Sequence, residues 1–302
     1  MPGTRVSILF VIAAGILFGT AGTAQALGPS GTTPIGVGVL RMQVGAVALL
    51  IAMPLLGNHP RRLLTLWRSP AMLVTALSAA IYQPLFFGAV SQVGVAFGTL
   101  VAVGSEPVLA GIVGWVVLRH RPTPGWIAAT AVAVAGLALR SFDSLGSGTT
   151  VGLLLALGAG LCSALYTVAA KVQLDRGVTA FEVPTGSFVL GGILLVPLLI
   201  GQPLEWVTEP SGVALVLYLG IATMAVANTL LTRGIHGLRP GPVATLMLTD
   251  PVVATILGVV VLGEALAPIA AVGVVMVLSG LVMQGLVLAR EEPDLEEPAP
   301  VL

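Results

Sequence analysis

The sequence predicts an all-α membrane protein whose ten transmembrane helices form two inverted five-helix repeats. Three observations predict this fold: the composition, the length of the apolar runs and an internal repeat. Of the 302 residues, 56% are hydrophobic and only 9% are charged, and the mean hydropathy is +1.04. A soluble domain typically carries about 25% charged residues, and one core cannot cover this much apolar surface. Lipid is therefore the expected solvent.

The apolar runs have the length that crosses a bilayer, which is about 20 residues for a helix. Short connections rich in glycine and proline separate them. Runs this long and this uniformly apolar favour helices, which satisfy their own backbone groups in lipid, over barrel strands. The predicted spans are 6–27, 35–56, 70–91, 94–118, 124–141, 150–172, 181–201, 211–233, 240–262 and 268–289.

The first span has an alternative interpretation as a secretory signal peptide. Arg5 precedes an apolar run, and Ala24-Gln25-Ala26 resembles a cleavage site. A retained helix is favoured, because the run from Val6 to Ala21 exceeds the usual length of about 7–15 apolar residues in a signal peptide. The internal repeat also requires this helix.

Cationic residues predict the orientation, since they concentrate in cytoplasmic loops. With a cytoplasmic N-terminus, Arg140 falls outside and Arg41 lies within a span. The other eleven of the thirteen fall on or near the cytoplasmic side: Arg5, Arg61, Arg62, Arg68, Arg119, Arg121, Lys171, Arg176, Arg233, Arg239 and Arg290. We therefore expect a multi-pass protein of the bacterial cytoplasmic (inner) membrane with both termini cytoplasmic. Residues 291–302, with five acids, are predicted to be a disordered cytoplasmic tail.

Two stretches of the chain repeat the same motif. Ser105-Glu106-Pro107 matches Thr249-Asp250-Pro251 at an offset of 144 positions. The same offset pairs Gly57 with Gly201, Leu118 with Leu262, Pro124 with Pro268, and Gly136 with Gly280. Each copy holds five spans, so the second copy enters the membrane from the opposite side, as in many secondary transporters. The predicted repeats are 1–145 and 146–290.

These motifs resemble the EamA family of the drug/metabolite transporter (DMT) superfamily, which are ten-helix exporters. The resemblance covers about residues 8–289 and rests on Leu40-Arg41, Glu106-Pro107, Leu118, Pro124, Gly136, Asp250-Pro251, Leu262-Gly263-Glu264, Pro268, Gly273 and Gly280. Arg119-His120 stands where the family has Gly-Glu, and Asp250 where it more often has Glu, which weakens any role for the Leu-Gly-Glu glutamate. The resemblance implies export of a small metabolite, amino acid or drug-like compound.

Three ionisable residues lie inside predicted spans: Arg41, Glu106 and Asp250. Each costs about 2.5–3.5 kcal/mol in lipid unless it faces protein or water, so they are predicted to point inward. Proline follows both acids and is expected to loosen the helix one turn earlier. The acids are candidates for coupling, by binding a cation or proton, or for structural contacts between helices. Arg41 is expected to pair with Glu106, to extend toward the interface, or to meet a substrate carboxylate.

Uncharged polar residues are the candidates for binding substrate, although amides and hydroxyls also bridge helices. The predicted substrate-binding residues are Thr20, Gln25, Tyr82, Gln83, Tyr166, Asn228 and Thr232. Gly15-x-x-x-Gly19 is predicted to permit close helix packing. Interfacial anchoring is the default interpretation of the four tryptophans, Trp67, Trp115, Trp126 and Trp206.

The functional hypothesis is a secondary transporter that works by alternating access, with proton coupling through Glu106 or Asp250 as one option. The alternative is a polytopic membrane enzyme or a lipid-handling protein. No catalytic or nucleotide-binding motif supports an enzyme. Cys162 is the single cysteine, the three histidines lie outside the apolar runs, and the net charge is zero. We therefore expect no cofactor, no metal and no nucleic acid. The expected partners are a small-molecule substrate and the lipid bilayer, and the protein is expected to be a monomer or homodimer.

Overall fold

The computed structural model describes residues 3–57, 59–93, 95–140 and 149–291. Within these ranges the secondary structure is helical, and nine helices are long and apolar enough to cross a membrane. A tenth apolar helix, Pro124–Leu139, is shorter. These helices occupy the ten predicted spans, so the predicted fold class is confirmed.

The first repeat contains five long helices and one short one that the sequence did not predict. They are α1 (Thr4–Ala26), α2 (Pro34–Leu55), α3 (Arg61–Leu66), α4 (Pro70–Val93), α5 (Val95–Leu118) and α6 (Pro124–Arg140). The unpredicted helix is α3, which a 3.0 Å ion pair between Arg62 Nε and Glu182 Oε1 ties to the second repeat.

The second repeat follows the same order with more irregular geometry. Its helices are α7 (Thr150–Asp175), α8 (Glu182–Leu195) with η2 (Val196–Leu199), η3 (Glu205–Thr208), α9 (Pro210–Tyr218), η4 (Leu219–Val226), α10 (Ala227–Gly237), α11 (Pro240–Leu246), α12 (Thr249–Leu262) and α13 (Pro268–Glu291). The predicted span 211–233 thus contains a π-helical segment, η4, between α9 and α10. The predicted span 240–262 is interrupted at Met247 and Leu248.

Backbone geometry repeats at the offset found in the sequence. Gly57 and Gly201 have φ of 74° and 80°, and Arg119 and Gly263 have φ of 59° and 69°. Each pair is 144 positions apart. All four lie in the left-handed region, where glycine is favoured because it has no Cβ. The two copies therefore end their helices with the same backbone turn.

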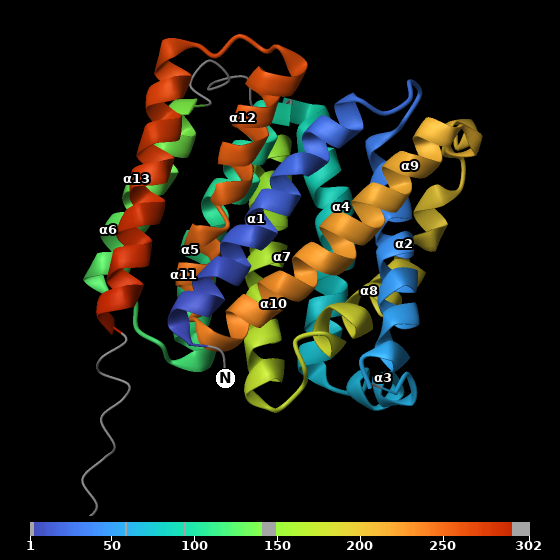
Figure 1. Cartoon of the computed structure of the whole chain (residues 1–302), viewed down its shortest axis with the longest axis horizontal. Helices are drawn as coiled ribbons and strands as arrows, with labels where there is room; N and C mark the ends of the chain where they lie inside the picture. Colours follow the sequence, from blue (N-terminus) through green and yellow to red (C-terminus); the bar gives the residue numbers. More distant parts are fainter. Residues whose placement is uncertain (1–2, 58, 94, 141–148, 292–302) are drawn as a thin grey trace, which may run out of the picture.

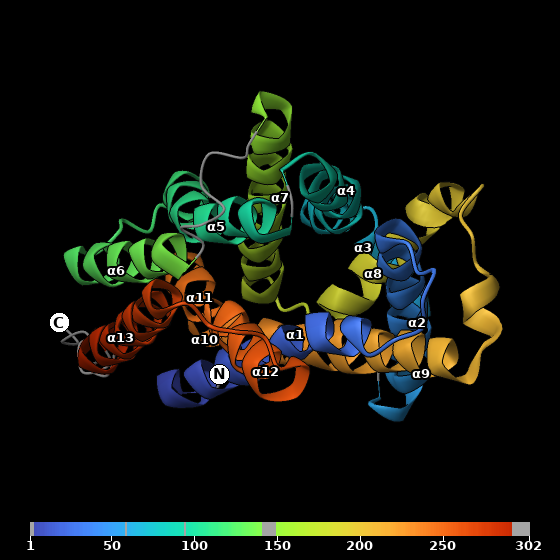
Figure 2. The same cartoon turned by 90° about the horizontal axis from the view of Figure 1, so that it is seen from above.

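The two repeats interleave in space (Figures 1 and 2). Helix α1 packs against α10 and α12, and its repeat equivalent α7 packs against α4 and α5. Helices α6 and α13, which are equivalent to each other, form a pair. The interface between the repeats therefore runs through the molecule, and α1 is an integral part of it.

Glycines permit the closest helix contacts. A Cβ on Gly15 would lie 3.0 Å from Thr249 Cβ, and one on Gly19 would lie 2.7 Å from the Asp250 carbonyl oxygen. The predicted Gly15-x-x-x-Gly19 motif thus packs the backbone of α1 against the start of α12.

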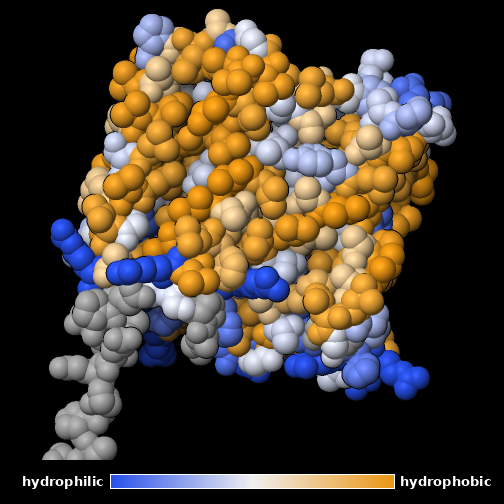
Figure 3. Space-filling model, viewed as in Figure 1, coloured by the Kyte–Doolittle hydropathy of each residue, from blue (hydrophilic) through white to orange (hydrophobic). Residues whose placement is uncertain are grey.

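Charge and apolar surface are segregated along the bundle. Helix α1 begins and α13 ends at the same end, the lower one in Figure 1. Apolar side chains cover most of the face in Figure 3, and hydrophilic residues gather at both ends. Exposed apolar residues such as Ile51, Val116 and Val282 fit a lipid-facing surface. The predicted boundary between repeats at 145/146 and nearly all of the predicted 291–302 tail lie outside the described residues.

Candidate functional site

Five of the predicted residues form one polar cluster that joins the repeats. Arg41 comes from α2, Tyr82 and Gln83 from α4, Glu106 from α5 and Asp250 from α12. Arg41 interacts electrostatically with Tyr82 and Asp250, and Glu106 with Asp250. The two repeat-equivalent acids thus share one electrostatic environment with one arginine.

Arg41 uses only part of its hydrogen-bonding capacity within the described residues. Arg41 Nη2 donates to Gln83 Oε1 over a long 3.5 Å, and Arg41 Nε is buried without a hydrogen-bond partner among the described residues. The Glu106 carboxylate accepts a hydrogen bond from Ser163 of α7. A buried guanidinium with an unused donor favours binding of a further acceptor.

The cluster residues are only partly covered by the surrounding helices. Arg41, Tyr82 and Glu106 are each half-buried. Tyr82 stacks on Phe86 with ring centroids 5.5 Å apart, and Phe86 meets Phe87 edge-on. Charged groups and aromatic rings therefore adjoin, a combination that suits an amphipathic molecule.

The helix breaks beside only one of the two acids. Asp250 lies in the first turn of α12, directly after the interruption at Met247 and Leu248. Helix α5 continues through Pro107, next to Glu106. The helix is therefore interrupted one turn before the proline in the second repeat, whereas α5 stays continuous in the first. Discontinuous helices at such depth are tolerated where they line protein or a cavity.

Of the other five predicted substrate-binding residues, Asn228 and Thr232 bond to the backbone of their own helical segment. Asn228 Nδ2 donates to the carbonyls of Thr223 and Met224 at 3.2 and 3.0 Å, and Thr232 donates to the Asn228 carbonyl. Tyr166 is buried against Phe188. The last two predicted residues, Thr20 and Gln25, both lie on α1, and Gln25 is in the last turn of that helix.

Thr20 points to a residue that sequence analysis missed. Its Oγ1 lies 2.7 Å from the hydroxyl of Tyr218 at the end of α9. Tyr218 is one of three tyrosines in the chain and the only one left out of the predicted set. The phenol group of Tyr218 within an apolar predicted span is the sequence signal that could have identified it.

Three of the four tryptophans donate a hydrogen bond from the indole nitrogen to another residue of the protein. Trp126 is only 8% exposed, and its Nε1 donates to Thr245 Oγ1, which also bonds Thr130. Trp206 is buried and donates to the Pro203 carbonyl, and Trp67 donates to the Gly186 carbonyl. The anchoring interpretation is therefore wrong for Trp126 and Trp206. Trp115 is 51% exposed, which agrees with it.

Two histidines and a carboxylate influence one another at the lower end of the bundle. Asp175 interacts with both His120 and His236, but it is tied to Lys171 by a 3.0 Å ion pair. Burial lowers the pKa of His120 below its usual value; Arg239 and Lys171 lower it further, and Asp175 opposes them. Within the described ranges, no group of three or more His, Cys, Asp or Glu residues is placed to hold a metal.

Comparison with known proteins relates the whole chain to membrane transporters. The sequence model of the EamA-like transporter family matches residues 5–142 and 150–285. The chain is 37% identical over 281 residues to an uncharacterized transporter, YwfM, of Bacillus subtilis (strain 168), covering 91% of this chain and 92% of that protein.

Two further similarities concern a named exporter and a fold. The chain is 28% identical over 270 residues, 89% of each protein, to a "probable terminal-alkyne amino-acid exporter" of Streptantibioticus cattleyicolor. A crystal structure superposes with a TM-score of 0.80 and 21% identity, over 94% of this chain and 99% of that one. The latter likeness concerns the fold alone.

Proposed function

We propose that this chain, which belongs to the EamA-like transporter family, exports a small amino-acid-like metabolite across the bacterial cytoplasmic membrane by alternating access. The observation that carries the proposal is the polar cluster, in which Arg41, Glu106 and Asp250 from both repeats interact electrostatically. Rocking of one repeat against the other would expose this cluster to each side of the membrane in turn.

The chemistry of the cluster fits a zwitterion. The unused donor of Arg41 suits a carboxylate, because guanidinium binds carboxylates through paired hydrogen bonds. Glu106 and Asp250 suit an ammonium group. Charges buried in lipid are costly unless they face protein, water or a ligand, so their retention favours function.

An apolar side chain on the substrate would suit the aromatic wall of Tyr82, Phe86 and Phe87. The name of the Streptantibioticus relative, an amino-acid exporter, supports the same class and the same direction of transport. We therefore expect an amphipathic amino acid as substrate.

Binding to purified protein tests this assignment. Isothermal titration with leucine and with a terminal-alkyne amino acid should show saturable binding, which Arg41→Gln weakens at least 10-fold. Arg61→Gln, which removes an exposed arginine at the lower end, is the matched control and should leave the affinity unchanged. Equal affinities for Arg41→Gln and Arg61→Gln would contradict the role of Arg41.

Proton coupling is the second part of the proposal. Glu106 and Asp250 are the titrating candidates because each can exchange an ammonium ligand for a proton. In proteoliposomes, an imposed pH gradient should drive uptake by the unaltered protein. Glu106→Gln or Asp250→Asn should abolish the response to the gradient while keeping downhill exchange. Unchanged pH-driven uptake in both variants would rule out coupling through these acids.

A further inference from the structure

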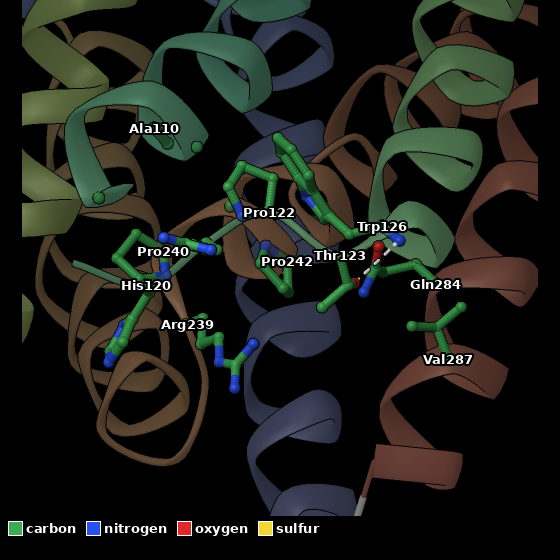
Figure 4. A pocket seen from close by; sticks show the side chains of 14 residues that line it. Ala110, His120, Pro122, Thr123, Trp126, Arg239, Pro240, Pro242, Gln284 and Val287 are labelled. Atoms are coloured by element: carbon green, nitrogen blue, oxygen red, sulfur yellow. Dashed lines mark hydrogen bonds between the residues drawn. The ribbon is translucent and has the colours of Figure 1, made fainter. Parts of the chain in front are cut away.

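A pocket at the lower end of the bundle lies apart from the polar cluster. It forms where the loop between α5 and α6 meets the turn between α10 and α11, and α13 closes one side (Figure 4). Its cavity volume is about 30 Å³, and it is partly open to the outside. Gly111 and Gly114 line its floor together with Trp126. Both repeats therefore contribute to it.

The mouth of the pocket is cationic. His120, Arg121 and Arg239 line it, and none of the described residues that line it is acidic. Arg121 and Arg239 are exposed, while His120 is partly buried. A carboxylate that acts on His120 belongs to Asp175, which is already paired with Lys171. Helix α6 also begins here, and the start of a helix carries partial positive charge.

A buried polar side chain lines the same pocket without a partner. Gln284 of α13 is 0% exposed, and both its Nε2 and its Oε1 lack a hydrogen-bond partner among the described residues. Figure 4 shows it beside Thr123 and Trp126, across the pocket from His120 and Arg239. An unpartnered buried amide is unfavourable, so its presence in a pocket favours a ligand that supplies the missing bonds.

The loop that carries the cations departs from its repeat equivalent. Arg119-His120 occupies the positions of Gly263-Glu264 in the second repeat, so cationic and imidazole side chains replace glycine and an acid. Arg119 adopts a φ of 59°, a conformation that glycine takes far more readily. The first repeat thus keeps an unfavourable backbone turn where it gains positive charge, which is typical of a functional segment.

We propose that this pocket binds a phosphate group, and specifically the headgroup phosphate of an anionic phospholipid. Arg121 and Arg239 would hold the phosphate oxygens, and Gln284 would hydrogen-bond deeper in the pocket. Helix ends lie at the depth of the lipid headgroups. Exposed apolar residues next to the pocket, Val117, Ile127 and Leu286, would contact the acyl chains. A free phosphate presents the same chemistry, and the experiment separates the two sources.

The test measures lipid and phosphate binding by the purified full-length protein. Native mass spectrometry with phosphatidylglycerol and phosphatidylcholine gives the lipid affinities. Isothermal titration with inorganic phosphate in detergent gives the affinity for free phosphate. The double variant Arg121→Gln/Arg239→Gln should weaken phosphatidylglycerol binding at least 10-fold. The control double variant Arg61→Gln/Arg176→Gln removes the same charge from the same end and should change it less than 2-fold.

The Gln284→Leu variant gives a second test, because its thermal stability and its lipid affinity are expected to change in opposite directions. It should raise the melting temperature of lipid-free protein, because it removes an unpartnered buried amide, and yet weaken phosphatidylglycerol binding several-fold. Glu106→Gln should bind the lipid normally, so this test is independent of the transport mechanism. Binding of inorganic phosphate without phosphatidylglycerol would overturn the lipid source and keep the phosphate site. Equal loss in both double variants would overturn the site itself. Equal binding of phosphatidylcholine, whose headgroup also carries a phosphate, would overturn the preference for an anionic lipid.

Discussion

At the scale of single residues, hydrogen-bond partners decide between structural and functional roles. Gln83 and Asn228 are both amides within apolar spans, at nearly equivalent positions of the two repeats. Gln83 accepts from Arg41, whereas Asn228 donates to two carbonyls of its own helix beside the π-helical segment η4. Gln83 therefore belongs to the polar cluster, and Asn228 supports the backbone.

Asn228→Leu should therefore lower stability without affecting substrate affinity. The change keeps the side-chain size but leaves the carbonyls of Thr223 and Met224 without this donor, at a cost of about 1–3 kcal/mol. Thr232→Val should cost less, since the Asn228 carbonyl it leaves is also available to the helix ladder. Thermal unfolding in detergent and substrate titration check both. A 10-fold loss of affinity for Asn228→Leu would instead make it a ligand.

The left-handed turns predict opposite responses at equivalent positions. Gly263→Ala should destabilise by about 1 kcal/mol, because φ is 69° there. Arg119→Gly should be neutral or stabilising, since it relieves the same conformation at φ 59°. Arg176→Gly is the control at a helix end with an ordinary φ of −92°, where glycine only adds chain entropy and should destabilise. The melting temperatures should rank Arg119→Gly above Arg176→Gly.

At the scale of elements, α6 and α13 pair through glycines that the sequence repeat relates. A Cβ on Gly136 would lie 2.6 Å from the Gly273 carbonyl oxygen, and one on Gly280 would lie 2.8 Å from that of Ala129. These obstacles are backbone atoms, which cannot move aside without separating the helices. The shared glycines therefore set the distance between the two helices.

Gly280→Ala should consequently destabilise the protein by about 1–3 kcal/mol through overpacking. Gly285→Ala, on the same helix, meets nothing within 4 Å and should be neutral or slightly stabilising. Thermal unfolding of the two variants in the same detergent provides the comparison. Similar melting temperatures would contradict close packing at Gly280.

At the scale of the whole molecule, charge is distributed between the two ends. The starts of α1 and α3 and the ends of α5, α7, α10 and α13 all lie at the lower end in Figure 1, and these segments carry most of the cationic residues. Acidic Glu205, Glu209 and Glu264 belong to loops and helix starts of the other end. This asymmetry favours a cytoplasmic lower end.

Accessibility labelling tests that orientation. In a Cys162→Ala background, Arg5→Cys and Arg290→Cys should react with a membrane-impermeant maleimide only after the cells are permeabilised. Ser30→Cys and Glu205→Cys should react in intact cells, because their segments lie at the opposite end. Labelling of Arg5→Cys and Arg290→Cys on different sides would contradict an even number of crossings.

The sequence by itself determined the helices, the repeat offset and the membrane environment, because apolar run length, the Glu106-Pro107 and Asp250-Pro251 match and matched glycines such as Gly57 and Gly201 are local properties of the chain. The tertiary structure alone decided which polar groups meet. Arg41, Glu106 and Asp250 come together because α2, α5 and α12 belong to two repeats that interleave, whereas Asn228 bonds to its own π-helical segment and Trp126 is buried and bonds to Thr245. Run length and composition do not determine how a helix is rotated about its axis or which helices are its neighbours. Both are determined only when the two repeats pack together.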